Sequence, residues 1–260
     1  MRNIGIVILY VFVSVMTACN AETNNQSSIK EDSKMEKEIT SQTQALEERK
    51  VNFAKKADAK TKGIYKEGLD AVFASGILKR AKNVGDVAPS FALKNALGKD
   101  VSLQELLQKG PVVLVWYRGG WCPYCNINLH YLQEELPNIK AQGANLVALT
   151  PELPDQSIST SEKNHLEFEV LSDIGNKVAK DYGVVFKLTD DVAKIYNEKF
   201  DLNSHNGDSS NELPLAATYI INTNGEIVYA FLDSDYRNRA EPKEITAFLK
   251  EMRKEEGKVK

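Results

Sequence analysis

The sequence predicts an α/β protein, with a central mixed sheet flanked by helices and a helical extension on its N-terminal side. Residues 112–117 are a continuous apolar run, rich in β-branched and aromatic side chains, which is typical of a strand buried on both faces. From Cys122 onward the apolar residues recur at helical spacing. Strands that alternate with helices pair in parallel, whereas the Asn224-Gly225 turn predicts an antiparallel hairpin. The sheet is therefore expected to be mixed.

The composition excludes several classes of protein. The chain has 260 residues, with 33 Lys and Arg against 36 Asp and Glu, a net charge of −3 and 42% hydrophobic residues. Such a chain lacks the basic surface that captures nucleic acid, and it is too hydrophobic to be disordered. Three cysteines are too few for a scaffold of several disulfides. What remains is a folded protein that is long enough to bury a substantial core.

The N-terminus has the pattern of an exported lipoprotein. Residues 1–18 combine Arg2 with a short apolar run, which predicts a signal peptide and is too short for a comfortable membrane span. Small residues before Cys19 resemble a bacterial lipobox, so we expect a lipid on Cys19 and a membrane anchor at the periplasmic or extracytoplasmic face. The alternatives are an uncleaved anchor, or an ordinary signal in which Cys19 is incidental. Residues 19–43 are polar and predict a flexible tether.

Two folded parts are expected after the tether. Residues 44–82 predict the helical extension, whose apolar face should end with its helix near Ser75-Gly76. That face comprises Ile64, Leu69, Val72, Phe73 and Ile77. Residues 83–255 predict the main domain. Its further strands are expected at 145–149, 168–171, 218–221 and 227–231, and its further helices at 174–182, 192–200 and 244–252.

The helix that begins at Cys122 carries both remaining cysteines on one face. The stripe comprises Cys122, Cys125, Leu129, Leu132, Leu136 and Ile139. Pro123 suits the first helical position, where its missing N–H has no cost, whereas Pro137 should kink or end the helix. Cys122 is thus expected at the mouth of the loop, and Cys125 one turn inside the helix.

A Cys-Pro-Tyr-Cys sequence at a helix start predicts a redox pair. The unpaired N–H groups and the dipole of the first turn lower the pKa of Cys122, and Arg118 adds positive charge. We therefore expect Cys122 to attack the substrate, Arg118 to stabilise its thiolate, and Cys125 to resolve the oxidised form. The spacing of three residues brings both sulfur atoms within reach of a disulfide.

Structural roles for the pair have weaker support. A zinc site needs about four ligands, and the pair plus three dispersed histidines do not supply a cluster. A disulfide across two residues closes too small a loop to stabilise the fold much. His130 is expected at the surface, and His165 and His205 carry no signal. Nothing in the sequence suggests a metal, nucleotide or flavin, so no cofactor is expected.

At this point the sequence resembles bacterial peroxiredoxin-like proteins of the alkyl hydroperoxide reductase/thiol-specific antioxidant superfamily. The resemblance covers roughly residues 45–252. It is carried mainly by residues 115–126, Val-Trp-Tyr-Arg-Gly-Gly-Trp-Cys-Pro-Tyr-Cys-Asn. Four shorter segments support it, at 74–78, 84–91, 149–151 and 235–242. It implies a thioredoxin-like fold, reduction of hydroperoxides by a cysteine thiolate, and an external thiol reductant such as a thioredoxin-like protein. It also makes Arg239 a candidate for the distant arginine that steadies the thiolate and the peroxide oxygens.

The sequence departs from the patterns of these proteins. Typical peroxiredoxins have Thr or Ser three residues before the reactive cysteine and Pro seven before it, where this chain has Gly119 and Val115. Typical thioredoxins have a buried acid at the position of Trp116. They also have a cis-proline at the position of Ala216, and Pro214 lies two residues too early.

Several aromatic residues surround the pair in the sequence. Trp116, Tyr117 and Trp121 either shape a substrate groove or pack in the core. Trp121, Tyr124 and Thr150 are the candidates for a groove.

The sequence favours a thiol peroxidase on a lipoprotein tether, with Cys122 oxidised to a sulfenic acid and Cys125 condensing with it. Two alternatives stay open. The first is a thiol-disulfide oxidoreductase that acts on protein disulfides, which the missing hydroxyl at Gly119 favours. The second is a non-enzymatic redox sensor or interaction protein, in which the pair switches the docking of a partner.

Overall fold

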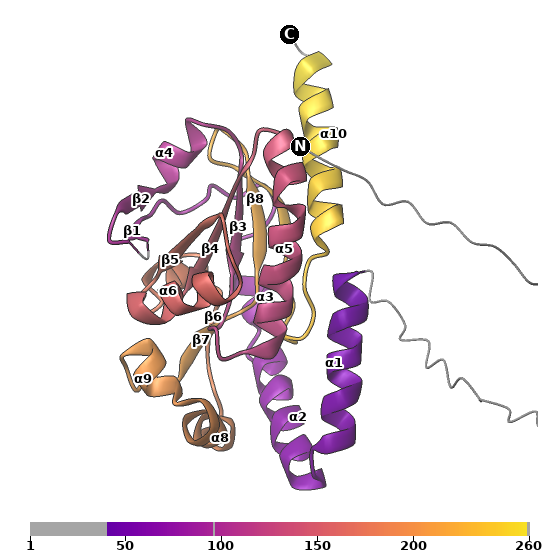
Figure 1. Ribbon diagram of the computed structural model, residues 1–260, viewed down its shortest axis with the longest axis vertical. Coiled ribbons are helices and arrows are strands. Elements are labelled where there is room, and N and C mark those ends of the chain that lie inside the picture. Colours follow the sequence, from indigo (N-terminus) through magenta and orange to yellow (C-terminus); the bar gives the residue numbers. More distant parts are fainter. Residues whose placement is uncertain (1–40, 96, 259–260) are drawn as a thin grey trace, which may run out of the picture. The chain divides into compact units, whose positions relative to one another are not determined.

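A five-stranded sheet forms the centre of the computed structural model, which describes residues 41–95 and 97–258 (Figure 1). Its strand order is β5-β4-β3-β8-β9. The strands are β3 (Val112–Trp116), β4 (Asn145–Thr150), β5 (Glu169–Ser172), β8 (Thr218–Ile221) and β9 (Ile227–Phe231). β3, β4 and β5 run parallel, whereas β8 and β9 are antiparallel to their neighbours. The mixed sheet confirms the expected α/β class.

β3 lies at the middle of the sheet, and all five of its residues are buried. Successive side chains of a strand point to opposite faces. Val112, Leu114 and Trp116 therefore enter the apolar cluster on one face, whereas Val113 and Val115 enter the cluster on the other. A strand that must be apolar at every position gives the continuous run seen in the sequence.

Helices cover both faces of the sheet (Figure 1). α5 (Pro123–Ala141), α10 (Pro242–Lys258) and α1 (Gln42–Lys56) contribute to the cluster that contains Val113. α3 (Ile77–Arg80), α4 (Leu103–Leu107) and α7 (Lys177–Asp181) contribute to the opposite cluster. The layers place the start of α5, and with it the predicted redox pair, near the end of β3.

The remaining elements are additions around this core. β1 (Ala92–Lys94) and β2 (Asp100–Ser102) form one small antiparallel sheet, and β6 (Val185–Lys187) and β7 (Glu212–Pro214) form another. α6 (Pro154–Lys163) follows β4. α8 (Asp190–Phe200) and α9 (Leu202–Asn206) are inserted between β6 and β7. α8 has its own apolar cluster, onto which Ile64 and Tyr65 of the N-terminal extension pack.

The helical extension differs in detail from the expectation. It consists of α1, α2 (Ala59–Ala74) and α3, and α2 ends at the expected place, since Ser75 is its C-cap. Phe73, however, is 70% exposed, so its placement on the packed face was wrong. Neighbouring helical residues point about 100° apart, as the period of 3.6 residues requires. Because Val72 is buried, Phe73 turns to solvent.

Pro137 does not end α5, which continues to Ala141. A proline removes one helical hydrogen bond. Leu136 and Ile139, on either side of Pro137, are fully buried, and their burial stabilises the helix across this point. Of the two expected outcomes at Pro137, a kink or an end, the end is therefore wrong, and the kink stays a prediction.

The predicted signal peptide, Cys19 and the tether up to residue 40 lie outside the described residues. Among the helices of residues 41–95 and 97–258, none combines the length and the apolar character that crossing a membrane requires.

Two glycines of α2 allow a matched test of this packing. At Gly63 an added methyl group would meet open space, whereas at Gly68 it would lie 2.8 Å from Cγ2 of Val192 in α8. We expect Gly63→Ala to raise the free energy of unfolding by about 0.5–1 kcal/mol, because alanine is the better helix former. Gly68→Ala should lose this gain to the clash. Urea unfolding measures both, and a destabilised Gly63→Ala protein would contradict the packing of α2.

Candidate redox site

Cys122 and Cys125 occupy the first turn of α5. Cys122 is the N-cap and Pro123 the first helical residue, as the sequence predicted. The carbonyl of Cys122 accepts hydrogen bonds from the backbone N–H groups of Cys125 at 3.0 Å and Asn126 at 3.1 Å. Both cysteines are free thiols and both are buried. The side chain of Cys122 thus lies at the positive end of a 19-residue helix, which favours a thiolate.

Two glycines shape the loop that leads into α5. Gly119 has φ +151°, and a Cβ there would run into the Trp121 ring and Glu152. A Cβ on Gly120 would overlap the hydroxyl of Thr160 in α6. This close approach leaves no space for a side chain at either position. The conformation of the loop therefore excludes Ser or Thr, and with it a hydroxyl, at position 119.

Two buried arginines lie at the pair. Arg118 is 1% exposed and Arg239 is 7% exposed. Nη2 of Arg239 lies 3.3 Å from Sγ of Cys125, and the backbone N–H of Arg118 approaches the same sulfur at 3.5 Å. In the described part of the chain neither guanidinium has an ion pair with a carboxylate, and Nε of both arginines has no hydrogen-bond partner. Arg239, which the sequence suggested only by resemblance, therefore lies at the cysteine pair.

Aromatic rings take the place of a carboxylate around Arg118. Its guanidinium carbon lies 3.8 Å from the ring centre of Tyr236, 5.0 Å from that of Trp121 and 5.1 Å from that of Tyr196. Nη2 also donates a 2.7 Å hydrogen bond to the hydroxyl of Tyr196. Cation–π contacts of this kind are worth about 2 kcal/mol or more when they are shielded from water. They hold the charge in place without neutralising it.

The surroundings of the two thiols shift their pKa values in opposite directions. Burial opposes ionisation of Cys122, but the hydrogen bond from Cys125 and the charges of Arg118 and Arg239 outweigh burial and lower the pKa of Cys122. Burial and the neighbouring Cys122 raise the pKa of Cys125 well above its ordinary value. Cys122 therefore ionises first, and Cys125 keeps its proton.

A hollow of about 100 Å³ opens beside Cys122. Trp121 and Tyr124, two of the expected groove residues, line it. The third, Thr150, is fully buried at the end of β4, and its hydroxyl accepts a hydrogen bond from the backbone of Glu152 at 3.4 Å. Additional walls come from Phe53 in α1, Tyr65 in α2, and Tyr196 and Phe200 in α8.

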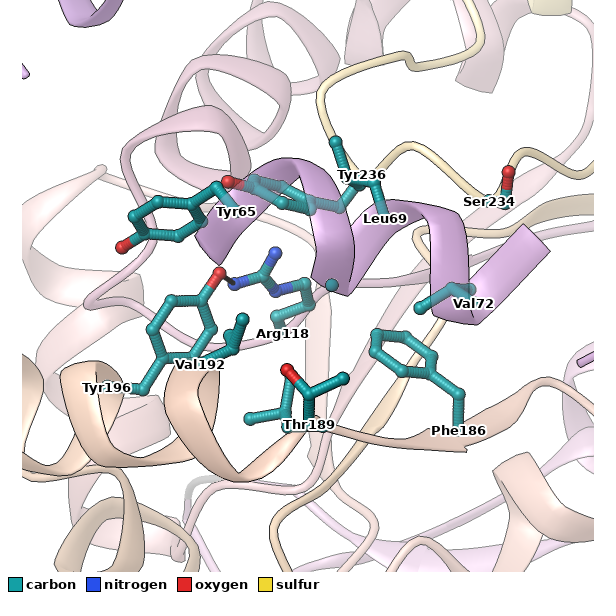
Figure 2. Close-up of a pocket in the computed structure, with 12 residues that line it drawn as sticks. Tyr65, Leu69, Val72, Arg118, Phe186, Thr189, Val192, Tyr196, Ser234 and Tyr236 are labelled. Atoms are coloured by element: carbon teal, nitrogen blue, oxygen red, sulfur yellow. Dashed lines mark hydrogen bonds between the residues drawn. The ribbon is translucent and has the colours of Figure 1, made fainter. Parts of the chain in front are cut away.

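A second, smaller hollow of about 20 Å³ lies between α2 and α8. It shares Tyr65, Arg118, Tyr196 and Tyr236 with the hollow beside Cys122. Figure 2 shows the Arg118 side chain reaching between these tyrosines. Arg118 thus borders both spaces, and its position depends on helices outside the central sheet.

Trp116 of β3 and Tyr117, which directly follows β3, have packing roles. Trp116 is buried with its ring centre 4.8 Å from Tyr182 and 5.9 Å from Tyr219, and Tyr117 is fully buried. Trp121 alone of the three uncertain aromatics lines the hollow, where it stacks on Phe200. No group of His, Cys, Asp and Glu suited to a metal occurs among residues 41–95 and 97–258.

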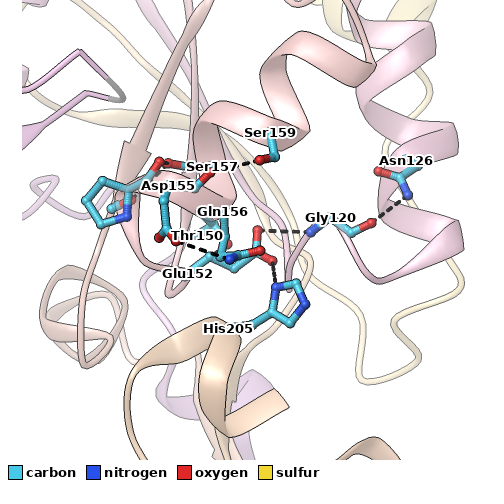
Figure 3. Close-up of polar contacts among 11 residues, drawn as sticks. Gly120, Asn126, Thr150, Glu152, Asp155, Gln156, Ser157, Ser159 and His205 are labelled. Atoms are coloured by element: carbon cyan, nitrogen blue, oxygen red, sulfur yellow. Dashed lines mark hydrogen bonds and ion pairs between the residues drawn. The ribbon is translucent and has the colours of Figure 1, made fainter. Parts of the chain in front are cut away.

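Glu152 and His205 were not among the site residues predicted from the sequence. Glu152 is fully buried after β4, and its carboxylate contacts the backbone of Gly120 and the ring of His205 in α9 (Figure 3). His130, in contrast, is exposed and lies against Glu134, as expected of a surface residue. Only Glu152 could have been found, from its position, because side chains that follow the carboxyl end of a parallel strand converge on one edge of the sheet.

Comparison with known proteins places this site in a family. Residues 84–230 match the AhpC/TSA family. The thiol-disulfide oxidoreductase ResA of Bacillus thuringiensis subsp. konkukian is 31% identical over 103 residues, which cover 39% of this chain and 58% of ResA. The chloroplastic peroxiredoxin Q of Triticum aestivum is 30% identical over 149 residues, which cover 52% of this chain and 68% of that protein. The chain thus spans less than two thirds of ResA.

Solved structures show the same fold. The peroxidoxin BcpB of Mycobacterium tuberculosis matches with a TM-score of 0.52 and 20% identity, over 65% of this chain and 96% of that one. The reduced 2-Cys peroxiredoxin of Plasmodium vivax matches with a TM-score of 0.53 and 19% identity, over 68% and 84%. These likenesses confirm the expected thioredoxin-like fold. With more than half of its length matched by the family, the chain belongs to the AhpC/TSA family.

Proposed function

We propose that the protein is a thiol peroxidase in which Cys122 is the attacking sulfur. The observation that carries this proposal is the burial of Cys122, which is 1% exposed and faces a hollow of about 100 Å³. A small hydroperoxide fits such a space. A disulfide on the surface of another protein would need a sulfur that projects to solvent.

The reaction needs only the two thiols and an external reductant. The Cys122 thiolate attacks the outer oxygen of ROOH, the O–O bond breaks, and RO⁻ leaves and takes up a proton to become ROH. The resulting sulfenic acid condenses with the Cys125 thiol, which forms a disulfide and releases water. A dithiol then reduces this disulfide by exchange, and its own sulfurs become oxidised. We propose a thioredoxin-like protein as the donor and no bound cofactor.

A second candidate function is thiol-disulfide exchange with other proteins. Gly119 supplies no hydroxyl to hold a peroxide, and the ResA relatives are thiol-disulfide oxidoreductases. For this reaction the helices that cover Cys122 would have to move aside. The two functions differ in the oxidant that reacts with Cys122.

Turnover of peroxide by cysteine variants tests the choice between them. We expect the reduced protein to consume hydrogen peroxide or cumene hydroperoxide with dithiothreitol as donor, and Cys122→Ser to abolish this activity. Cys125→Ser should still be oxidised once, leaving a sulfenic acid on Cys122 that dimedone traps. Reduction of insulin without consumption of peroxide would support the second function instead. Inertness toward both substrates would support a redox sensor.

Removal of one positive charge tests the origin of the thiolate. We expect Arg239→Gln to raise the pKa of Cys122, because a charge that favours the ionised sulfur is lost. The pH midpoint for alkylation of Cys122 by iodoacetamide should move upward, and the rate at pH 6 should fall by roughly tenfold.

Arg237→Gln is the matched control for this measurement. Arg237 lies two residues away and is paired with Asp235. Its variant should leave the pH midpoint for alkylation of Cys122 close to that of the wild type. Equal effects of the two substitutions would contradict the role of Arg239.

We also propose export and anchoring through a lipid on Cys19, on the basis of the N-terminal sequence. Mass spectrometry of the membrane fraction should find a chain that begins at a lipid-modified Cys19, and Cys19→Ala should release the protein from that fraction. An intact N-terminus with unmodified Cys19 would contradict this location.

A further inference from the structure

A buried acid, Glu152, binds the loop that connects β3 to α5. Glu152 is 0% exposed, and its Oε2 accepts a 2.9 Å hydrogen bond from the backbone N–H of Gly120. Its other oxygen, Oε1, lies 3.0 Å from Nδ1 of His205. Figure 3 shows Glu152 between Gly120 and His205. One carboxylate therefore joins the loop of the redox site to α9.

The loop is held on its other side by α5. The carbonyl of Gly120 accepts a 2.8 Å hydrogen bond from the side chain of Asn126, and the N–H of Cys122 donates to the carbonyl of Gly119 at 3.1 Å. Both backbone groups of Gly120 are thus fixed, one by the helix and one by Glu152. Without Glu152, the loop would stay tied to α5 but lose this bond to the segment after β4.

His205 is the titratable group that contacts the Glu152 carboxylate directly. A buried carboxylate costs several kcal/mol unless it is paired and hydrogen-bonded. The hydrogen bond to Glu152 raises the pKa of His205, although partial burial opposes this, and Asp155 and Asp201 act in the same direction as Glu152. Tyr117, from the end of β3, also faces Glu152, and the negative charge of Glu152 adds to burial in raising the pKa of that phenol.

α9 is tied to this position by a backbone bond as well. The N–H of Leu153 donates to the carbonyl of His205 at 2.9 Å. The imidazole and the carboxylate are therefore set against each other by two adjacent contacts. A segment inserted between β6 and β7 thereby reaches the loop of the redox site.

We infer that Glu152 and His205 are positioning residues for the chemistry of Cys122. The carboxylate fixes Gly120, so that Arg118 at one end of the loop and Cys122 at the other keep the relative position that stabilises the thiolate. His205 holds the carboxylate in its orientation through the contact between Nδ1 and Oε1. The inference rests on Cys122 being the reactive thiolate of the proposed function, but it does not depend on which oxidant reacts with it.

The His205 variants test the inference without a peroxide assay. The probe is iodoacetamide, and the readout is the pH dependence of Cys122 alkylation in the full-length reduced protein, followed by mass spectrometry. We expect His205→Ala to move the midpoint to higher pH and to lower the rate at pH 6 by roughly threefold or more. His205→Asn should restore most of the rate, because its amide can still donate to Glu152. Ser159→Ala, on the exposed side of α6, is the control and should match the wild type.

Glu152 variants separate positioning from stability. Glu152→Gln retains an oxygen that accepts from Gly120 and should shift the alkylation midpoint less than Glu152→Ala. Thermal melting is measured for each variant, since a structural role alone lowers the melting temperature but leaves the midpoint in place. If Glu152→Ala does not fold, the half-buried His205 carries the test. Midpoints equal to the wild type in both His205→Ala and every folded Glu152 variant would overturn the inference.

The outcome is distinguishable from failure of the proposed function. A shifted alkylation midpoint in a protein that does not consume peroxide would leave the positioning role standing and remove the peroxidase. Rapid peroxide turnover with unshifted alkylation midpoints would support the peroxidase and remove the positioning role.

Discussion

Burial of two guanidinium groups that have no carboxylate partner among residues 41–95 and 97–258 is the interaction on which the candidate redox site depends. An uncompensated buried charge costs several kcal/mol. Here the cost of burying Arg118 is offset by three aromatic rings and a tyrosine hydroxyl, and Arg239 lies against the sulfur of Cys125. The missing negative charge is the one that Cys122 gains when it ionises. The arginines favour the thiolate, and the thiolate in turn makes their burial less costly.

Keeping those charges away from water requires elements beyond the central sheet. The segment that matches the family, residues 84–230, contains the cysteine pair, Arg118 and α8. It excludes α1, α2 and the loop before α10, which supply Phe53, Tyr65 and Tyr236 to the hollow beside Cys122 and place Arg239 at Cys125. The strand, loop and helix thus provide the sulfur that we propose as reactive, whereas flanking segments determine its access and its electrostatic surroundings.

Much of this arrangement is predictable from local pattern. The buried strand β3 and the apolar stripe of α5 follow from the periodicity of short segments, whereas the roles of the two thiols stay a prediction. Phe73 was misplaced because adjacent apolar residues cannot share one face of a helix. Arg239 is 114 residues from Cys125, so only resemblance suggested it. The contact between Glu152 and His205 spans 53 residues, and neither residue has a neighbour whose spacing reveals it. Polar contacts between residues far apart in the chain produce no periodic pattern in the sequence.

The same charges also affect the second half of the proposed redox cycle, in which the disulfide is reduced. Conversion of the thiolate into a disulfide removes the negative charge between Arg118 and Arg239, while both guanidinium groups stay buried. The two positive charges therefore stabilise the reduced pair relative to the disulfide. A disulfide whose reduced form is stabilised in this way is easily reduced. Cys125 keeps its proton beside the thiolate and loses it only as the disulfide forms. In the proposed cycle, the asymmetry that favours the Cys122 thiolate thus also favours return of the pair to its reduced state by an external dithiol.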